Sequence, residues 1–291
     1  MDSIIENLNK YLKNSEKSMS AFGKRLILKG NYKNIQEDMN SGTFVKLDKI
    51  KLIKSYLSVI PQFLIFKDIM FKNSFIKKYK SICKKQSRLF NYDLIIHSIV
   101  LEMLNRQNLL ERDICVIGDG KGNFVHGVLD IKGVRRIYSV NLPQSLIQDY
   151  LILKQYNSID HRLIKVVNNN QDLLDENCKI FLIPAENKNL LSNQKINLFV
   201  NMFSFQEMPL SETHNYIEII KSNSAYLYSL NREKKTMFDG DVISYSDYGI
   251  WEKGKIIFEK EAKFVKKFYN LKFPFIHNKN GKVISTLASF A

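Results

Sequence analysis

The hydrophobic pattern divides the chain into two parts near residue 111. Before that point, apolar residues recur at three- and four-residue spacing over residues 50–60 and 94–104, which predicts two amphipathic helices. Residues 1–12 also have the pattern of a polar amphipathic helix. We therefore expect residues 1–110 to form a helical N-terminal region or lid that covers one end of the following domain.

From residue 111 onward, short apolar runs alternate with helical patterns. The run at 114–117 ends at a glycine, as is typical of a buried parallel strand, and a helix over 123–130 follows it. A second strand at 136–140 precedes Pro143, a residue that suits the first turn of a helix. Further strands are predicted at 179–183, 196–202 and 225–230, a helix at 211–221, and an edge strand at 283–290.

Strands that alternate with helices imply right-handed crossovers and a mostly parallel sheet with helices on both faces. The predicted fold class is α/β, with a Rossmann-like doubly wound sheet over residues 111–291 and the helical region before it.

A glycine-rich segment, GDGKG at residues 118–122, follows the first predicted strand and opens a helix. Glycine lets the backbone turn tightly and approach a ligand closely, and the helix start offers free N–H groups. The dinucleotide fingerprint GxGxxG would need a third glycine where this chain has Asn123. The pattern GxGxG suits the methionine portion of S-adenosylmethionine (SAM) better than a pyrophosphate.

The second predicted strand ends at Asn141, where Rossmann-like domains usually place an acidic residue that binds ribose hydroxyls. An amide can still donate and accept hydrogen bonds with a diol, although it has no charge. Asn141 is therefore either a cofactor ligand or a turn residue that precedes Leu142 and Pro143.

The formal net charge of +15 comes mostly from lysine. An excess of lysine, asparagine and isoleucine is what an AT-biased coding sequence produces, and the charge also fits an anionic membrane surface. No run is apolar for long enough to span a bilayer, and the N-terminus lacks a signal-peptide core. The three cysteines match no zinc spacing, and the carboxylates show no metal-ligand spacing. We expect a cytoplasmic protein without a metal, peripheral to the inner membrane if it contacts one.

Three segments carry a resemblance to a known family: IGDGKG at 117–122, VNLPQ at 140–144 and NMFSFQEMP at 201–209. Together with the strand-like YLYSLNR at 226–232, they make residues 92–232 similar to the sugar O-methyltransferase family of bacterial glycan clusters. The resemblance implies a class I methyltransferase fold, SAM as the methyl donor and a sugar hydroxyl as the acceptor. It also implies that Gly118, Gly120 and Asn141 face the cofactor.

Methyl transfer to a hydroxyl needs an in-line approach, a dry pocket and a base that takes the proton. Glu207 is the leading candidate base or acceptor-orienting carboxylate, and His214 is a second candidate base. A loop carboxylate bonded to backbone amides and a packed histidine are the structural alternatives. The complete set comprises catalytic Glu207 and His214; cofactor-binding Gly118, Asp119, Gly120, Gly122, Asn141, Leu142 and Asn201; and substrate-binding Gln206 and Asn231.

The predicted function is a SAM-dependent O-methyltransferase that acts on a hydroxyl of a sugar or surface glycan precursor. A methyltransferase with a non-sugar acceptor is one alternative, but residues 201–204 are not an NPPY-type motif and we expect no nucleic-acid partner. The other is a catalytically inactive, methyltransferase-like binding or scaffold protein, which Val116 and Asn141 favour because related sites often carry acidic residues there.

Overall fold

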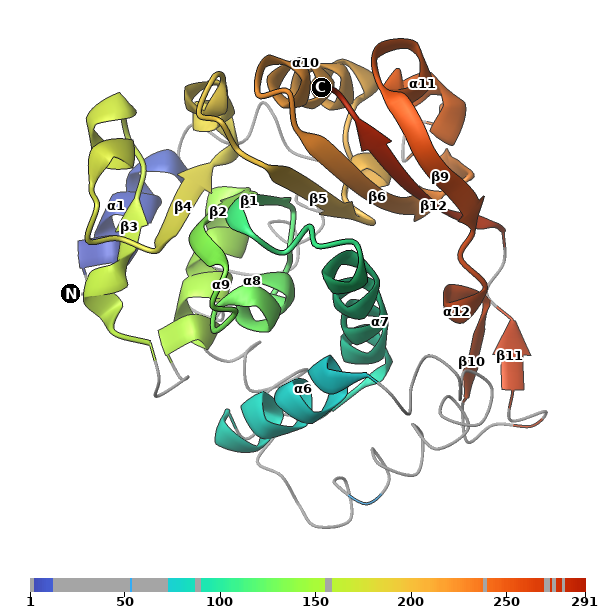
Figure 1. Ribbon diagram of the computed structural model, residues 1–291, viewed down its shortest axis with the longest axis horizontal. Helices are drawn as coiled ribbons and strands as arrows, with labels where there is room; N and C mark the ends of the chain where they lie inside the picture. Colours follow the sequence, from blue (N-terminus) through green and yellow to red (C-terminus); the bar gives the residue numbers. More distant parts are fainter. Residues whose placement is uncertain are drawn as a thin grey trace.

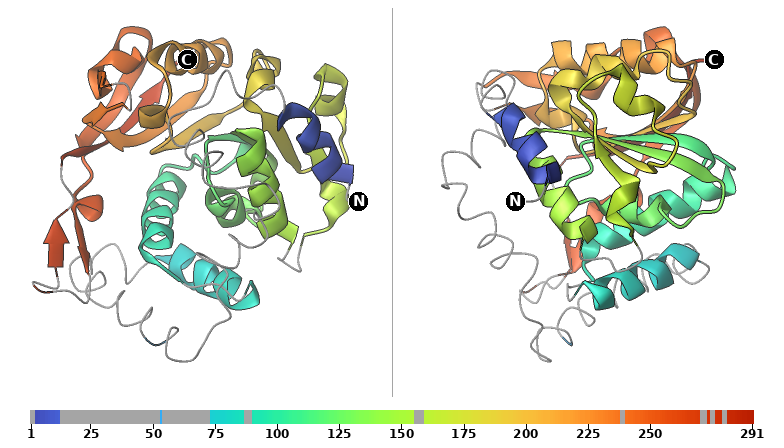
Figure 2. Two further views of the ribbon diagram at one scale, coloured as in Figure 1. Left: turned by 180° about the vertical axis from the view of Figure 1, so that it is seen from behind. Right: turned by 90° about the vertical axis from the view of Figure 1, so that its left-hand side faces the viewer.

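The computed structural model describes residues 3–12, 53, 73–86, 90–154, 159–237, 240–269, 273, 276–278 and 281–291. Apart from Ile53, the helix predicted over 50–60 lies outside these residues. An eight-stranded sheet lies between two layers of helices, as Figures 1 and 2 show.

The first six strands of the sheet run parallel to one another, and most are buried on both faces. They are β1 (Arg112–Ile117), β2 (Val134–Asn141), β3 (Ile164–Val166), β4 (Ile180–Pro184), β5 (Leu198–Met202) and β6 (Tyr226–Arg232). The sheet order is β3-β4-β2-β1-β5-β6-β12-β9. Apart from the short edge strand β3, the parallel strands therefore follow the 3-2-1-4-5 order of a doubly wound Rossmann sheet. This order confirms the predicted fold class.

The strand predicted at 283–290 is present, but the prediction that it lies at the edge of the sheet was wrong. Strand β12 (Val283–Ser289) lies between β6 and β9 (Lys255–Glu261) and is antiparallel to both. β9 covers the outer side of β12, so β12 is mostly buried, whereas β9 alternates between exposed and half-buried residues. Because β9 carries four charged residues in seven, its sequence lacks the apolar run that marks a buried strand.

Helices cover both faces of the sheet (Figure 1). One layer contains α1 (Ser3–Leu12), α6 (Ser74–Lys85), α7 (Tyr92–Arg106), α8 (Asn123–Val128) and α9 (Pro143–Lys154). The other contains α10 (Leu210–Ser222) and α11 (Ile250–Lys253). Short 3₁₀ segments are η3 (His161–Leu163), η4 (Asn170–Leu174), η5 (Ala185–Leu191), η6 (Phe205–Glu207) and η7 (Tyr245–Tyr248). Outside the sheet lie α12 (Lys263–Lys266) and two antiparallel pairs, β7 (Lys234–Thr236) with β8 (Val242–Ser244) and β10 (Lys267–Tyr269) with β11 (Ile276–Asn278).

The described N-terminal helices share a hydrophobic core with the sheet. Leu8 of α1, Tyr79 of α6 and Val100 of α7 belong to the same buried cluster as Val116 of β1. Asparagine side chains begin α6 and α7, since the side-chain oxygens of Asn73 and Asn91 accept backbone N–H groups of the first turn. Within the described part of the chain, no helix is both long and apolar enough to cross a membrane.

Gly127 of α8 lies where this helix meets α6 and α7. A Cβ atom at Gly127 would overlap the side chains of Leu101 and Tyr79. We predict that Gly127→Ala lowers the free energy of unfolding by about 1–3 kcal/mol, because overpacking a filled core forces side chains and backbone apart. Urea unfolding measures the effect, with Ser81→Ala on the exposed side of α6 as the control. An unchanged Gly127→Ala midpoint would show that the three helices are not closely packed in solution.

Candidate active site

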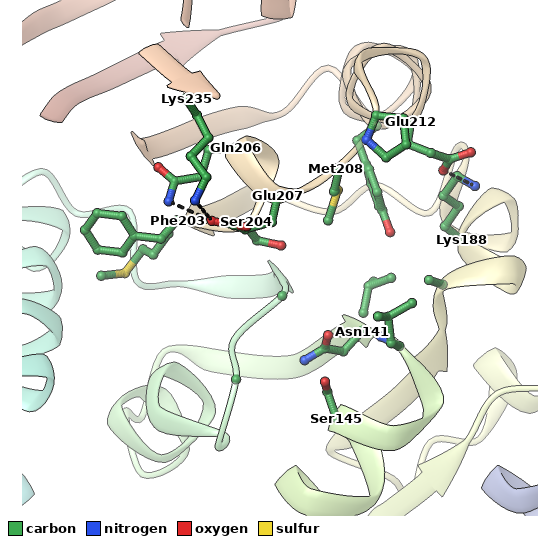
Figure 3. A pocket seen from close by; sticks show the side chains of 18 of the residues that line it. Asn141, Ser145, Lys188, Phe203, Ser204, Gln206, Glu207, Met208, Glu212 and Lys235 are labelled. Atoms are coloured by element: carbon green, nitrogen blue, oxygen red, sulfur yellow. Dashed lines mark hydrogen bonds and ion pairs between the residues drawn. The ribbon is translucent and has the colours of Figure 1, made fainter. Parts of the chain in front are cut away.

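A cavity of about 830 Å³ opens at the carboxyl ends of the parallel strands (Figure 3). This is where an open α/β sheet binds its ligands, close to the point between β1 and β5 at which the strand order reverses. The volume falls in the upper part of the usual range of about 300–1,000 Å³ for small-molecule sites. The glycine loop, the end of β2, the segment after β5 and strand β7 all contribute to its lining.

The glycine loop presents two of its residues to the cavity, Gly118 and Gly120. Both have positive φ angles, +70° and +53°, and no heavy atom lies within 4 Å of the place where a Cβ of Gly120 would be. The carboxylate of Asp119 instead accepts the amides of Phe124 and Val125 at 2.7 and 3.0 Å and so caps α8. The carbonyl of Gly122 bonds to a ring nitrogen of His126 on α8, at 2.6 Å. The structure therefore brings the first two glycines to the cavity, but not Asp119 or Gly122.

The opposite side of the glycine loop touches the segment after β5. A Cβ at Gly118 would overlap the side chain of Ser204, so these two segments of the chain approach each other as closely as a glycine permits. Phe203, which lines the cavity, has φ of +63°, an uncommon conformation for a bulky residue. Such strained residues persist where the surroundings hold them, and they cluster at functional sites.

Asn141 and Leu142, two of the predicted cofactor ligands, line the cavity. The Asn141 side chain accepts the amide of Leu142 at 2.9 Å and donates from Nδ2 to Asp149 at 3.3 Å. Two neighbouring polar residues were not predicted: Ser145 from α9, and Glu186, which follows β4. Since Asn141 pairs in register with Pro184, Glu186 lies just beyond the same sheet edge. Burial raises the pKa of the Glu186 carboxyl above its ordinary value.

Asn201 and Asn231 do not line the cavity. Both are fully buried, and Nδ2 of Asn231 donates to Oδ1 of Asn201 at 2.9 Å. Asn201 also donates to the carbonyl of Ile117 at 3.2 Å and accepts the amide of Phe205 at 3.1 Å. These two predicted ligands therefore join the ends of β1, β5 and β6, and they contribute to the site by holding its backbone.

Gln206, the predicted substrate ligand, and Glu207, the predicted base, both line the cavity. Oε1 of Glu207 accepts from Nζ of Lys235 at 2.9 Å and from Nε2 of Gln206 at 3.3 Å. Gln206 is itself held because its Oε1 accepts the amide of Arg232 at 2.8 Å. Oε2 of Glu207 has no hydrogen-bond partner among the residues that the structure describes. Figure 3 shows Glu207 and Lys235 across the cavity from Asn141 and Ser145.

A second ion pair, Lys188 with Glu212 at 2.9 Å, lies on the same cavity wall as Met208 (Figure 3). Nζ of Lys188 also lies 5.9 Å from the ring centre of Tyr216, which lines the cavity too. Neither Lys188 nor Lys235 was predicted, because an isolated lysine in a lysine-rich chain carries no signal. The wall thus combines two charge pairs with methionine and aromatic side chains.

The structure does not bring His214 to the cavity. One ring nitrogen, Nε2, bonds to the backbone carbonyl of Asp247 at 2.7 Å, which ties α10 to η7. The carbonyl oxygen requires a donor, so the imidazole carries a proton on Nε2. This contact matches the packed-histidine alternative. In the part of the chain that the structure describes, no group of three or more His, Cys, Asp or Glu residues could hold a metal ion.

No protein-family model and no curated protein matches the chain. Among solved structures, it is similar to a protein studied for the conversion of a disulfide bond into a thioacetal group during echinomycin biosynthesis, with a TM-score of 0.45, 8% identity, and coverage of 65% of this chain and 80% of the other. The N-methyltransferase NodS from Bradyrhizobium japonicum WM9 has a TM-score of 0.43 and 9% identity, with coverage of 68% of this chain and 96% of NodS. The methyltransferase domain of bacterial CtHen1 has a TM-score of 0.41 and 10% identity, with coverage of 68% of this chain and 100% of that domain. These similarities are too low to assign a function.

The strand order, the switch-point cavity and the glycine loop define a Rossmann-like α/β protein with a small-molecule site. No particular family follows from the comparisons, so the function must come from the chemistry of the site.

The close contact between Gly118 and Ser204 leaves no room for a larger residue at position 118. Gly118→Ala should lower the free energy of unfolding by about 1–3 kcal/mol, because the methyl group overlaps Ser204 at a positive φ. Ser204→Gly in the same chain should recover part of the loss by removing the overlap, while the cost of the positive φ remains. Thermal unfolding of the two single variants and the double variant measures this. Strictly additive effects would show that the residues are not in contact.

Proposed function

We propose that this chain is a SAM-dependent O-methyltransferase that acts on a hydroxyl of a sugar or glycan precursor. The observation that carries the proposal is the arrangement of the cavity. An open glycine loop and polar groups for a nucleoside lie on one side, and the carboxylate of Glu207 lies on the other. The acceptor class comes from the sequence resemblance.

The residues present fit the cofactor. The backbone at Gly118 and Gly120 can approach a ligand, and the space in front of Gly120 is open. Asn141, Ser145 and Glu186 offer an amide, a hydroxyl and a carboxylate that suit ribose hydroxyls and an amino group. Apolar side chains beside them, Leu142 and Ala185, suit a flat base.

When bound, SAM supplies an electrophilic methyl group whose bond to sulfur breaks with the electron pair left on sulfur, as a new bond forms to the acceptor oxygen. Oε2 of Glu207 is the atom that we assign to the hydroxyl proton. Lys235 and Gln206 hold the other oxygen, which fixes the direction in which Oε2 points. Met202 and Phe203 line the same cavity with apolar side chains, which disfavour water next to the reacting atoms.

The acceptor side contains both donors and acceptors of hydrogen bonds. The pairs Lys188–Glu212 and Lys235–Glu207 each place a cation next to an anion, so the wall offers polar contacts without a large net charge. Tyr216 adds an aromatic surface. A neutral, polyhydroxylated acceptor is compatible with the two ion pairs and with the aromatic ring.

The cofactor is tested first, by calorimetric titration with SAM and S-adenosylhomocysteine. We expect micromolar binding, and we expect Gly120→Asp to weaken it at least about a hundredfold, because a charged side chain fills the open space before the loop. Gly281→Asp is the matched control, since Gly281 also has positive φ and open space around it but does not line the cavity. Equal affinity in wild type and Gly120→Asp would show that the loop is only a turn.

Glu207→Gln tests the chemistry. We expect kcat to fall by about 10²–10⁴-fold, the usual contribution of a positioned general base, with the affinity for S-adenosylhomocysteine within about twofold of wild type. The assay follows SAM consumption in a screen of nucleotide sugars and glycans. Glu233→Gln, which removes an exposed carboxylate paired with Lys282, is the control. Equal losses of turnover and of cofactor affinity would assign Glu207 a structural role.

A further inference from the structure

A buried carboxyl group lies behind the cofactor side of the cavity. Asp149 of α9 has no exposed surface and does not line the cavity. Its Oδ2 accepts from Nδ2 of Asn141 at 3.3 Å, and its Oδ1 has no hydrogen-bond partner among the described residues. Since Ser145 is one helical turn earlier on the same face, this face of α9 presents Ser145 to the cavity and Asp149 to the structure beneath it.

The backbone of Asp149 lies beside the glycine loop. A Cβ atom at Gly122 would lie 3.6 Å from the backbone oxygen of Asp149 and 3.5 Å from a ring nitrogen of His126. Burial raises the pKa of the Asp149 carboxyl well above its ordinary value, and the charge of Asp119 raises it further. The side chain of Asn141 and the amides of Lys121 and Gly122 act in the opposite direction. The charged side chain that acts on Asp149 is thus Asp119 of the loop, while the imidazole of His126 on α8 bonds to the neighbouring Gly122.

We propose that Asp149 is a positioning residue, which orients Asn141 and supports the glycine loop for the cofactor, and that its buried carboxyl is the reason that residue 141 is an amide. The proposal rests on the proposed function only for the identity of the ligand. The contact between the two side chains exists without it.

The chemistry of the pair explains the choice of residue. The amide of Asn141 uses its oxygen for Leu142 and one N–H for Asp149, and its second N–H remains for the cavity. An aspartate at 141 would keep the bond to Leu142 but would place a second carboxyl oxygen 3.3 Å from Asp149, where the N–H now lies. Two carboxyl groups so close cannot both be ionised, and they would have to share a proton.

The test is a double-mutant cycle of Asn141→Asp, Asp149→Asn and the two together. The exchange restores one donor and one acceptor, because an asparagine at 149 can donate to an aspartate at 141. For Asn141→Asp alone, we expect the affinity for S-adenosylhomocysteine to fall about tenfold between pH 6 and pH 8.5, as the pair loses its shared proton. In the exchanged variant we expect affinity within about threefold of wild type at both pH values.

Thermal unfolding provides a second measurement that needs no ligand. Because the pKa of Asp149 is raised in the folded state, this side chain keeps its proton to a higher pH in the native protein than in the unfolded chain, where its ordinary value is 3.8. The contribution of Asp149 to stability therefore falls as pH rises through the window between that value and the raised one. We expect the difference in Tm between Asp149→Asn and wild type to become more favourable to the variant as pH rises. We also expect the exchanged variant to unfold at a higher temperature than Asn141→Asp.

The two hypotheses fail in different ways. If wild type does not bind SAM or S-adenosylhomocysteine, the proposed function is wrong, while a non-additive unfolding cycle still supports the pair. If wild type binds but both the unfolding and the affinity effects are additive, the proposed role of Asp149 is wrong. Should Asn141→Asp not fold, recovery of folding by the second substitution supports the pair, and an exchanged variant that is no better than Asn141→Asp overturns it.

Discussion

Two buried amides hold together the end of the sheet on which the site is built. Where the strand order reverses between β1 and β5, the chain leaves the two strands in different directions, so backbone groups at the strand ends lose their partners. Asn201 on β5 donates to the carbonyl of Ile117 at the end of β1 and accepts the amide of Phe205 at the start of η6, and Asn231 on β6 donates a further hydrogen bond to the side-chain oxygen of Asn201. Since an unpaired buried polar group is costly, these contacts fix the start of η6. The strained backbone of Phe203 and the position of Glu207 follow from that constraint.

The charge of the site differs from the charge of the chain. Although the formal net charge is +15, both lysines that line the cavity are paired with glutamates. Exposed lysines occur elsewhere, for example Lys77, Lys84 and Lys85 on α6. The net charge of the chain therefore does not describe the charge of the cavity wall, and under the proposed function the paired groups favour a neutral acceptor over a strongly anionic one. Any attraction to an anionic surface would act on the outside of the molecule.

Most buried strands could be predicted from the sequence, whereas the short strand β3 and the elements without a core face could not. The strands β1, β2, β4, β5 and β6 are apolar runs between helices, so their place in a parallel sheet follows from composition and spacing. The edge strand β9 and the hairpins lack such runs. For the site, the rule that ligands follow strands selected Gly118, Gly120, Asn141, Gln206 and Glu207, which line the cavity, and also Asn201 and Asn231, which are buried in the core. The position of a residue at the end of a predicted strand shows that it lies at the carboxyl edge of the sheet. Whether its side chain points into the cavity or into the core depends on the register of the strand, which the sequence does not give.

Asp149 shows the limit of helical spacing and also changes how Asn141 is interpreted. A single acid among Leu146, Ile147 and Tyr150 would ordinarily be assigned to the solvent side of α9, yet it is fully buried. From the sequence alone, Asn141 suggests that the carboxylate of a ribose site has been lost, which favours an inactive scaffold. The structure places one carboxyl behind Asn141 and another, Glu186, beyond the neighbouring strand. Of these two groups only Glu186 lines the cavity, so the cavity keeps one carboxyl group near the amide of Asn141, while Asp149 acts from behind it.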